Sequence, residues 1–171
     1  ACLVGSEMCI RDRSEAFRRK QDTLHFIKKA EKDTLAVYKY PEGTLVDLNE
    51  ADTTELKKIP GIGSGIARMI VAYRKRLGGF YDMAQLKEVN YVDEDMLRWF
   101  KLGNAPIHRI NANKAGLDKL RSHPYMNFYQ AKVIIEYRRK KGKLKSLSQL
   151  SLYEEFTEKD LERLSHYLAF D

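Results

Sequence analysis

Apolar side chains recur at helical spacing between residues 64 and 77. The residues at positions i, i+3, i+4 and i+7 of this stretch are Ile66, Met69, Ile70 and Tyr73. An α-helix turns once every 3.6 residues, so this spacing gathers the four side chains into one stripe. The stretch is therefore predicted to be an amphipathic helix with this stripe packed against a core.

A shorter helix is predicted before it, followed by a tight turn. Asp52 and Glu55 have the three-residue spacing of a capping box, and the helix they open is expected to run to Lys58. The sequence Pro60-Gly61-Ile62-Gly63 then breaks the helix. Gly78-Gly79 is expected to end the second helix at a C-cap. The pattern indicates two helices joined by a hairpin.

The whole unit repeats after 64 residues. Residues 83–89 and 93–100 are predicted to form two more short helices, and the same order returns in the second half. The positions that are identical at this offset are Asn49 and Asn113, Ala51 and Ala115, Leu56 and Leu120, Pro60 and Pro124, Ala67 and Ala131, Ile70 and Ile134, Tyr73-Arg74 and Tyr137-Arg138, Gly78 and Gly142, Gln85-Leu86 and Gln149-Leu150, and Leu97 and Leu161. Self-similarity at a fixed period indicates a repeat protein. The prediction is an all-α fold of two tandem repeats, residues 46–109 and 110–171.

The residues before the repeats have a different character. Residues 14–45 are highly charged with irregularly spaced apolar residues, which predicts a tether or a loosely docked helix. Residues 1–13 resemble the translation of a sequencing-library adapter, so we expect them to be an artefact that hides the true N-terminus. Both cysteines, Cys2 and Cys9, lie in that segment.

The charge of the chain favours polyanionic partners. Lys and Arg number 31 against 24 Asp and Glu, a net charge of +7. The surplus is largest in residues 110–171, which carry 12 basic and 8 acidic side chains. A positive field attracts nucleic acid. No apolar run is long enough to cross a membrane, so a membrane tether would have to come from the missing N-terminus.

The first hairpin has the features of a phosphate site. Gly61 and Gly63 are expected to adopt positive φ and to leave the backbone open, while Ile62 plugs the gap between the helices. Backbone N–H groups at the start of the second helix then face one spot, where the helix dipole favours an anion. Basic side chains within about one turn add charge. The predicted nucleic-acid-binding residues are Lys58, Gly61, Ile62, Gly63, Ser64, Gly65 and Arg68.

The other three hairpins lack this glycine pattern. In the second repeat the corresponding sequence is His123-Pro124-Tyr125-Met126-Asn127. Tyr125, together with Phe128 and Tyr129 beside it, is expected to pack into the core, or else to form an exposed aromatic patch. We therefore expect binding to fall on the first repeat, and Gly63→Val to abolish most of it because valine resists positive φ.

A second basic cluster stands at the end of the later long helix. It comprises Arg138, Arg139, Lys140 and Lys141. Two interpretations are open. The cluster is a secondary patch that contacts a polyanion, or its charges are solvated and interact favourably with the helix dipole.

Large apolar side chains flank the connection between the repeats. Trp99, Phe100 and Ile107 have little to bury against within one 64-residue unit. We expect them at an interface between the repeats, which would restrict independent motion of the two.

Residues 46–80, VDLNEADTTELKKIPGIGSGIARMIVAYRKRLGGF, resemble the helix-hairpin-helix repeat of the competence DNA-receptor (ComEA-like) family. The resemblance covers roughly residues 44–171 and is strongest in the first repeat. It implies tandem helix-hairpin-helix repeats of the (HhH)2 type, with the hairpin glycines on the DNA backbone and no sequence preference. It also implies a module anchored at the cell envelope, outside the cytoplasmic membrane, that acts in DNA uptake.

The leading hypothesis is a non-enzymatic protein that binds double-stranded DNA independently of sequence. The alternatives are a protein-interaction scaffold that kept the fold, and an accessory DNA-binding module of a larger nucleic-acid enzyme. No catalytic constellation is found, and the four histidines have no ligand spacing. No metal, cofactor or small-molecule substrate is therefore expected.

Overall fold

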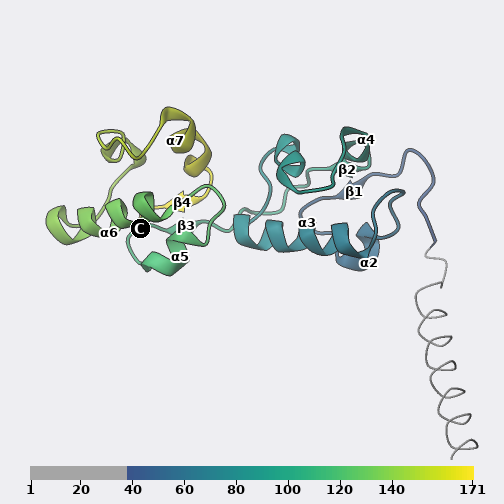
Figure 1. The fold of residues 1–171 in the computed structure, drawn as a ribbon, viewed down its shortest axis with the longest axis horizontal. Helices are drawn as coiled ribbons and strands as arrows, with labels where there is room; N and C mark the ends of the chain where they lie inside the picture. The colour runs from purple at the N-terminus through teal and green to yellow at the C-terminus, as the bar shows by residue number, and fades with distance from the viewer. Residues whose placement is uncertain (1–37) are drawn as a thin grey trace, which may run out of the picture. The chain divides into compact units, whose positions relative to one another are not determined.

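The computed structural model describes residues 38–171, and the segment predicted to be an artefact lies outside them. The first repeat contains α2 (Thr53–Leu56), α3 (Ser64–Leu77), the 3₁₀ helix η1 (Met83–Glu88) and α4 (Glu94–Leu97), flanked by β1 (Val46–Asp47) and β2 (Phe100–Lys101). The second contains α5 (Leu117–Arg121), α6 (Phe128–Lys141), the 3₁₀ helix η2 (Leu147–Gln149) and α7 (Glu158–Ser165), flanked by β3 (Ile110–Asn111) and β4 (Leu168–Ala169) (Figure 1). The predicted α fold is confirmed.

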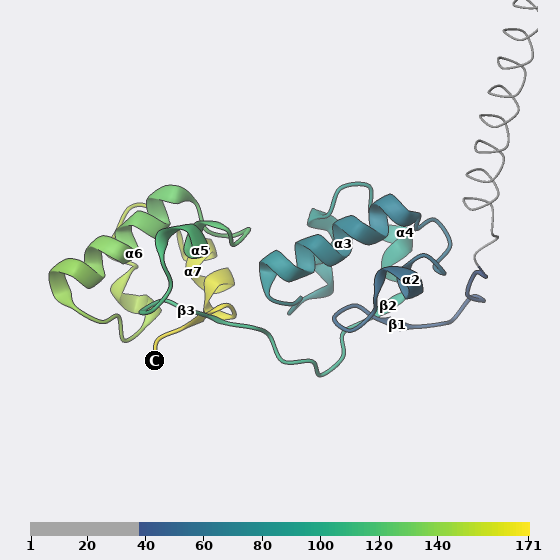
Figure 2. The same ribbon diagram turned by 90° about the horizontal axis from the view of Figure 1, so that it is seen from below.

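Each repeat closes on itself through a short parallel strand pair. In the first repeat Val46 pairs with Phe100, and in the second Ile110 pairs with Leu168. The extended lead into the repeat thus lies beside the segment that leaves it. An extended segment then runs from β2 to β3 (Figure 2). The strand that pairs with this lead was not predicted from the sequence.

The asparagine that repeats at the 64-residue offset is a structural clamp. The Asn49 side chain donates to the Phe80 carbonyl at 2.9 Å and accepts from the Phe80 N–H at 2.8 Å. Asn113 makes the same two bonds with Leu144, at 2.9 and 2.8 Å. In both repeats the amide joins the lead segment to the residue just after the long helix.

The hairpins are plugged by an apolar residue, as predicted for Ile62. Ile62 is 1% exposed, and Met126 and Phe156 at the corresponding places in two other hairpins are also buried. The N–H of Ile62 donates to the Ile59 carbonyl three residues back, at 3.2 Å. The plug therefore fixes the turn both by burial and by a backbone bond.

The last helix of the second repeat is one turn longer than its counterpart. α4 has 4 residues and α7 has 8, although their N-caps Asp93 and Thr157 keep the 64-residue offset. Trp99 and Tyr167 occupy equivalent places, because their carbonyls accept from the first residue of the lead strand in each repeat. Trp99 and Tyr167 are 68 residues apart, four more than the repeat offset of 64, because of the extra turn in α7. Tyr167 therefore follows a longer helix than Trp99 does, and its contacts differ.

Tyr167 packs into the apolar core of the first repeat. It is completely buried there, and its hydroxyl donates to the Gly79 carbonyl at 2.9 Å. The Gln85 amide donates to the hydroxyls of Tyr167 and Tyr125, at 2.9 and 2.8 Å. The two repeats are thus joined by a buried aromatic residue with satisfied polar groups.

The residues predicted to join the repeats were the wrong ones. Trp99 and Phe100 are buried within the core of the first repeat itself, and Ile107 packs against the same core. The sequence argument assumed that one 64-residue unit had no room for them. The strand pair and the turn after α4 bury them there. The residues that join the repeats are instead His123 and Tyr125, in the hairpin before α6, and Tyr167, after α7.

His123 is a buried polar member of this contact. It is 2% exposed, and its Nε2 lies 3.1 Å from the Leu77 carbonyl of the first repeat. Burial, with a contribution from the Arg76 charge, lowers the pKa of this imidazole to about 4. The histidine is therefore neutral in the folded protein at neutral pH.

This burial predicts a loss of stability in acid. Between about pH 6.5 and about pH 4 the unfolded chain binds a proton at His123 that the folded chain does not. Stability therefore falls as the pH drops through that window, by at most about 3 kcal/mol. Urea unfolding at a series of pH values measures it. His123→Leu should flatten this part of the profile, whereas His108→Gln, at an exposed site, should leave it as in the wild type. Identical profiles for all three proteins would contradict the assignment.

Candidate nucleic-acid interface

The two glycines of the first hairpin have different backbone conformations. Gly61 has a φ of +84°, the left-handed conformation that favours glycine. Gly63 is the N-cap of α3 with a φ of −92°. The prediction of positive φ is therefore confirmed for Gly61 and wrong for Gly63. The helix begins directly after Gly63, and an extended N-cap is the ordinary way to enter it.

The N-terminus of α3 has no cap of its own. Gly63 has no side chain, and the first donor of the helical ladder is the N–H of Ala67, which bonds to the Gly63 carbonyl at 3.0 Å. The N–H groups of Ser64, Gly65 and Ile66 find no backbone or side-chain acceptor among residues 38–171. Three donors thus stand at the positive end of a 14-residue helix.

The approach to these donors is open. Gly63, Ser64 and Gly65 are exposed. A Cβ added at Gly63 or Gly65 would meet no atom within 4 Å. An anion can therefore reach the helix start without moving any part of the protein, which is the arrangement that favours phosphate.

Basic side chains surround the hairpin. Arg68 is exposed and lies along the first turn of α3, with its Nε donating to the Ser64 carbonyl at 3.1 Å. Lys58 lies over the Tyr40 ring, 5.5 Å from its centroid. Both predicted cations are thus held near the turn, with Lys58 partly engaged by an aromatic ring.

Lys39 is a further cation here that sequence reasoning missed. Its Nζ donates to the carbonyls of Lys57 and Ile59 at 2.6 and 3.1 Å, and the Tyr40 N–H donates to the Lys58 carbonyl at 2.8 Å. These carbonyls follow the C-terminal end of α2, and that of Ile59 also accepts from the Ile62 N–H. Lys39 lies 20 residues before the turn, in a segment with no periodic pattern, so no local signal pointed to it.

Ile62 needs a correction as a binding residue. It was predicted among the nucleic-acid-binding residues, yet its side chain is 1% exposed and its N–H is used within the turn. The buried Ile62 side chain supports the turn that holds Gly61 and Gly63, and it is not available to contact a ligand.

The corresponding hairpin of the second repeat caps itself. The Asn127 side chain accepts from the Gln130 N–H at 2.8 Å, and the Gln130 side chain accepts from the Asn127 N–H at 2.9 Å. Tyr125, at the place of Gly61, turns its hydroxyl to Glu88 of the first repeat at 2.7 Å. This helix start is closed to phosphate by its own side chains.

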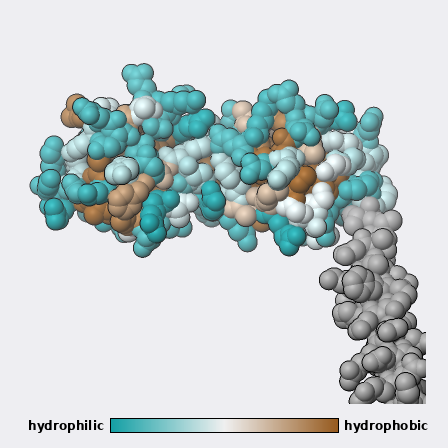
Figure 3. All heavy atoms as spheres, viewed as in Figure 1, coloured by the Kyte–Doolittle hydropathy of each residue, from teal (hydrophilic) through white to brown (hydrophobic). Residues whose placement is uncertain are grey.

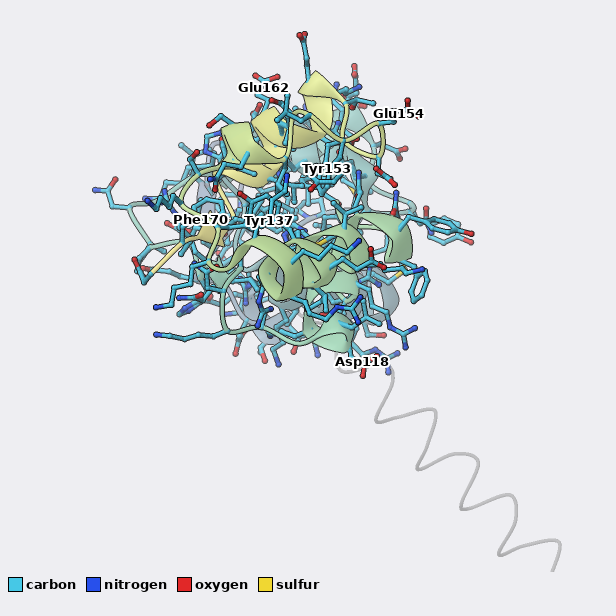
Figure 4. The ribbon with its side chains drawn as sticks, turned by 90° about the vertical axis from the view of Figure 1, so that its left-hand side faces the viewer. Asp118, Tyr137, Tyr153, Glu154, Glu162 and Phe170 are labelled. Atoms are coloured by element: carbon cyan, nitrogen blue, oxygen red, sulfur yellow. The ribbon has the colours of Figure 1, made fainter. Side chains whose placement is uncertain are left out.

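The two remaining hairpins present carboxylates. Asp93, Glu94 and Asp95 are exposed at the start of α4. In the second repeat Glu154 and Glu155 are exposed in the turn before α7; Figure 4 shows Glu154 at the outer edge, away from Tyr137 and Tyr153. Negative charge at these places repels a phosphate backbone.

The secondary basic patch is split by the structure. Arg138 is partly buried and its Nη1 donates to the Ala115 carbonyl at 2.6 Å, as Arg74 does to Leu48 and Ala51. Arg138 therefore fixes the lead segment through this bond, and its contact with a polyanion stays a prediction. The same role in both repeats explains why this arginine recurs.

The other three members of the patch are exposed. Lys140 lies 3.7 Å from the Glu136 carboxylate. Lys141 lies over the rings of Tyr137 and Tyr153, at 5.5 and 6.0 Å. Arg139 remains the member whose charge is least engaged within the described residues. The patch is thus weaker than its composition suggested.

The backbone of the first hairpin predicts a matched pair of stability effects. Gly61→Val should destabilise the protein by about 2–3 kcal/mol, because valine strains at positive φ and its Cβ would meet Met96 Cε at 3.2 Å. Tyr91, at the equivalent place in the next hairpin, already has a φ of +65°. Tyr91→Gly should therefore stabilise by up to about 1 kcal/mol. Urea unfolding measures both, and a stabilising Gly61→Val would contradict the geometry.

The family comparison agrees with this geometry. A family model described as a helix-hairpin-helix motif matches residues 42–99 and 106–169, one match for each repeat. The chain belongs to the helix-hairpin-helix family. Membership of this family indicates nucleic-acid binding, and the two matches confirm the two predicted repeats.

Among curated proteins, the chain is similar to endonuclease/exonuclease/phosphatase family domain-containing protein 1. The mouse protein is 27% identical over 154 residues, covering 71% of this chain and 27% of the relative. The Xenopus laevis protein is 25% identical over 146 residues, covering 71% and 26%. The chain thus spans about a quarter of the length of these relatives. No solved structure matches the chain.

Two further kinds of site are absent from the part of the chain that the structure describes. Residues 38–171 contain no group of three or more His, Cys, Asp or Glu placed to hold a metal ion. None of their helices is both long and apolar enough to cross a membrane.

Proposed function

We propose that this helix-hairpin-helix protein binds duplex DNA without sequence preference, through phosphate contacts at the first hairpin. The observation that carries the proposal is the uncapped start of α3, where three N–H groups face an open approach. These donors read charge and shape and do not reach base edges. The binding is non-enzymatic, and each repeat is an (HhH)2-type unit of two hairpins.

The proposed contacts fall on one side of the first hairpin. Ser64 and Gly65 offer backbone donors, and Gly63 leaves their approach clear. Gly61 makes the turn that aims them. Lys58, Arg68 and Lys39 add positive charge that attracts the backbone from a distance.

A salt series tests this proposal. With about 2–4 phosphate contacts, a plot of log K against log salt should have a slope of about −2 to −4. Unrelated duplexes of equal length should bind alike. Fluorescence anisotropy of labelled duplexes with the full chain measures both quantities. A tenfold or greater preference for one sequence, or an affinity insensitive to salt, would overturn the phosphate mechanism.

A second candidate function is an accessory nucleic-acid-binding module of a larger enzyme. It is favoured by the name of the relatives and by the quarter of their length that the chain spans. It predicts that the intact protein cleaves or dephosphorylates its substrate, and that Gly63→Asn raises the KM for long duplexes without changing kcat. An unchanged KM would exclude this role.

The resemblance to the competence DNA-receptor family leads to a different setting, DNA uptake by a protein anchored at the cell envelope. That setting rests on the resemblance alone, and none of the curated relatives points to it.

The remaining alternative is a protein-interaction scaffold that kept the fold and lost the nucleic-acid ligand. If the protein is such a scaffold, no duplex binding is expected even at low salt. The salt series above therefore also tests the scaffold.

A further inference from the structure

An exposed aromatic pair stands at the start of the long helix in the second repeat. Phe128 is 46% exposed and Tyr129 is 68% exposed. Their rings lie edge to face with centroids 5.7 Å apart. The packing into the core that the sequence favoured is wrong for both residues, and the alternative of an exposed patch is confirmed.

This pair occupies the place that faces phosphate in the first repeat. At the 64-residue offset Phe128 corresponds to Ser64, and Tyr129 corresponds to Gly65. The first repeat presents bare backbone there, whereas the second presents two rings over a helix start closed by Asn127. The two repeats thus differ at the same place: the first exposes backbone donors and the second exposes two aromatic rings.

The pair is unlike the other exposed apolar residues of the described chain. Those residues are Tyr38, Leu45, Tyr91 and Leu152, none of which stacks on another member of the set. In Figure 3 apolar surface shows among hydrophilic residues over both repeats. Two rings are too small an area for a stable protein complex, which buries about 1,200 Å² or more. One ring face is enough for one stacked base.

Exposed basic side chains lie on α5 and α6, the two helices joined by the hairpin that carries the pair. Lys132 follows Phe128 by four residues on α6 and so lies on the same face of the helix. The charged side chains of α5 are Lys119, Arg121 and the acidic Asp118. Glu136 lies 3.8 Å from Lys132, and the Asp160 carboxylate of α7 accepts from the Gln130 amide beside the pair. An aromatic face beside exposed cations is the combination that binds single-stranded nucleic acid.

We infer that Phe128 and Tyr129 form a stacking platform for unpaired bases. This inference rests on the proposed function and narrows its ligand to duplexes with a single-stranded overhang. The first hairpin holds the backbone of the paired part, and the platform takes a base that the paired part cannot offer, because bases within a duplex are already stacked.

The test compares a blunt duplex with the same duplex carrying an overhang that contains 2-aminopurine. The full chain should bind the overhang duplex about tenfold more tightly and quench its 2-aminopurine fluorescence. Phe128→Ala with Tyr129→Ala should abolish that difference and the quenching, and Tyr129→Trp should retain both. Leu152→Ala, at a site 84% exposed in another hairpin, is the matched control and should behave as the wild type.

Other outcomes would overturn the platform. Equal affinity of the wild type for both duplexes, or equal losses on both in the double variant, would do so. So would a double variant that keeps the preference for the overhang duplex. Tyr129→Ala alone, at the more exposed ring, serves as the second variant if the double variant unfolds. Gly63→Asn reports on the proposed function separately, because it acts on the blunt duplex.

Discussion

Gly63→Asn is expected to weaken duplex binding by about 10- to 100-fold while leaving the protein folded. Asparagine fits the N-cap backbone at φ −92°, and nothing lies within 4 Å of its Cβ. Its side chain should accept from the N–H of Ile66, as Asn127 accepts from Gln130 at 2.8 Å. The donor that phosphate needs is then taken, and charge-assisted bonds to backbone N–H groups contribute about 1.5–3 kcal/mol.

The second repeat offers the reciprocal control. Asn127→Gly should leave duplex affinity nearly unchanged and cost a few tenths of a kcal/mol of stability, because it removes a cap from a helix start that is not the proposed phosphate site. Fluorescence anisotropy gives the affinities, and urea unfolding confirms that Gly63→Asn is at least as stable as the wild type. Equal losses of affinity at the two sites would refute the assignment of binding to the first hairpin.

Tyr167→Ala is expected to cost about 3–5 kcal/mol and to separate the unfolding of the two repeats. The ring is fully buried in the core of the first repeat although it belongs to the end of the second. Removing it leaves a cavity and deprives the Gly79 carbonyl of its donor. With that ring gone, the aromatic contacts that still couple the two halves are those of Tyr125 and the stack of Tyr81 on His166.

Tyr167→Phe separates the two causes. It keeps the ring and removes the hydroxyl bonds to Gly79 and Gln85, so a loss of about 1–2 kcal/mol and a single transition are expected. Urea unfolding followed by circular dichroism and by Trp99 fluorescence, which reports on the first repeat, measures both variants. Coincident transitions in Tyr167→Ala would show that the repeats are coupled through other residues.

Local signals in the sequence predicted the elements that depend on their own residues. The capping box of Asp52 with Glu55, the left-handed C-cap at Gly78 and the plug at Ile62 all follow from spacing within a few residues. Such patterns report local backbone conformation, which short-range sterics and hydrogen bonds determine.

The contacts that were missed join residues far apart in the sequence. Arg138 was read as a free charge, yet it bonds to Ala115, 23 residues away. Trp99 was predicted to lie at the interface between the repeats, but it is buried in the core of the first repeat, beside the strand pair. Whether a side chain meets solvent or a distant carbonyl depends on the tertiary arrangement, which periodicity does not encode. The 64-residue offset was the best available clue, since Arg74 repeats the role of Arg138.

The same limit applies to the candidate site. The glycine pattern located the hairpin, but it assigned positive φ to Gly63 as well as to Gly61. Two glycines in one turn do not reveal which of them carries the left-handed residue. The hairpin at residues 123–127 was interpreted from the sequence only as one that had lost its glycines. In the structure His123 and Tyr125 contact Leu77 and Glu88 of the first repeat and so join the two repeats.

The bonds made by Lys39 and Tyr40 decide where a recombinant fragment should begin. The family match starts at residue 42, and a fragment trimmed to that boundary would lack both partners of the α2 carbonyls. Its first hairpin would then start from a frayed helix end, with one cation fewer beside the turn. A weak affinity for DNA measured on such a fragment would result from the missing Lys39 and Tyr40 and would not represent the longer chain.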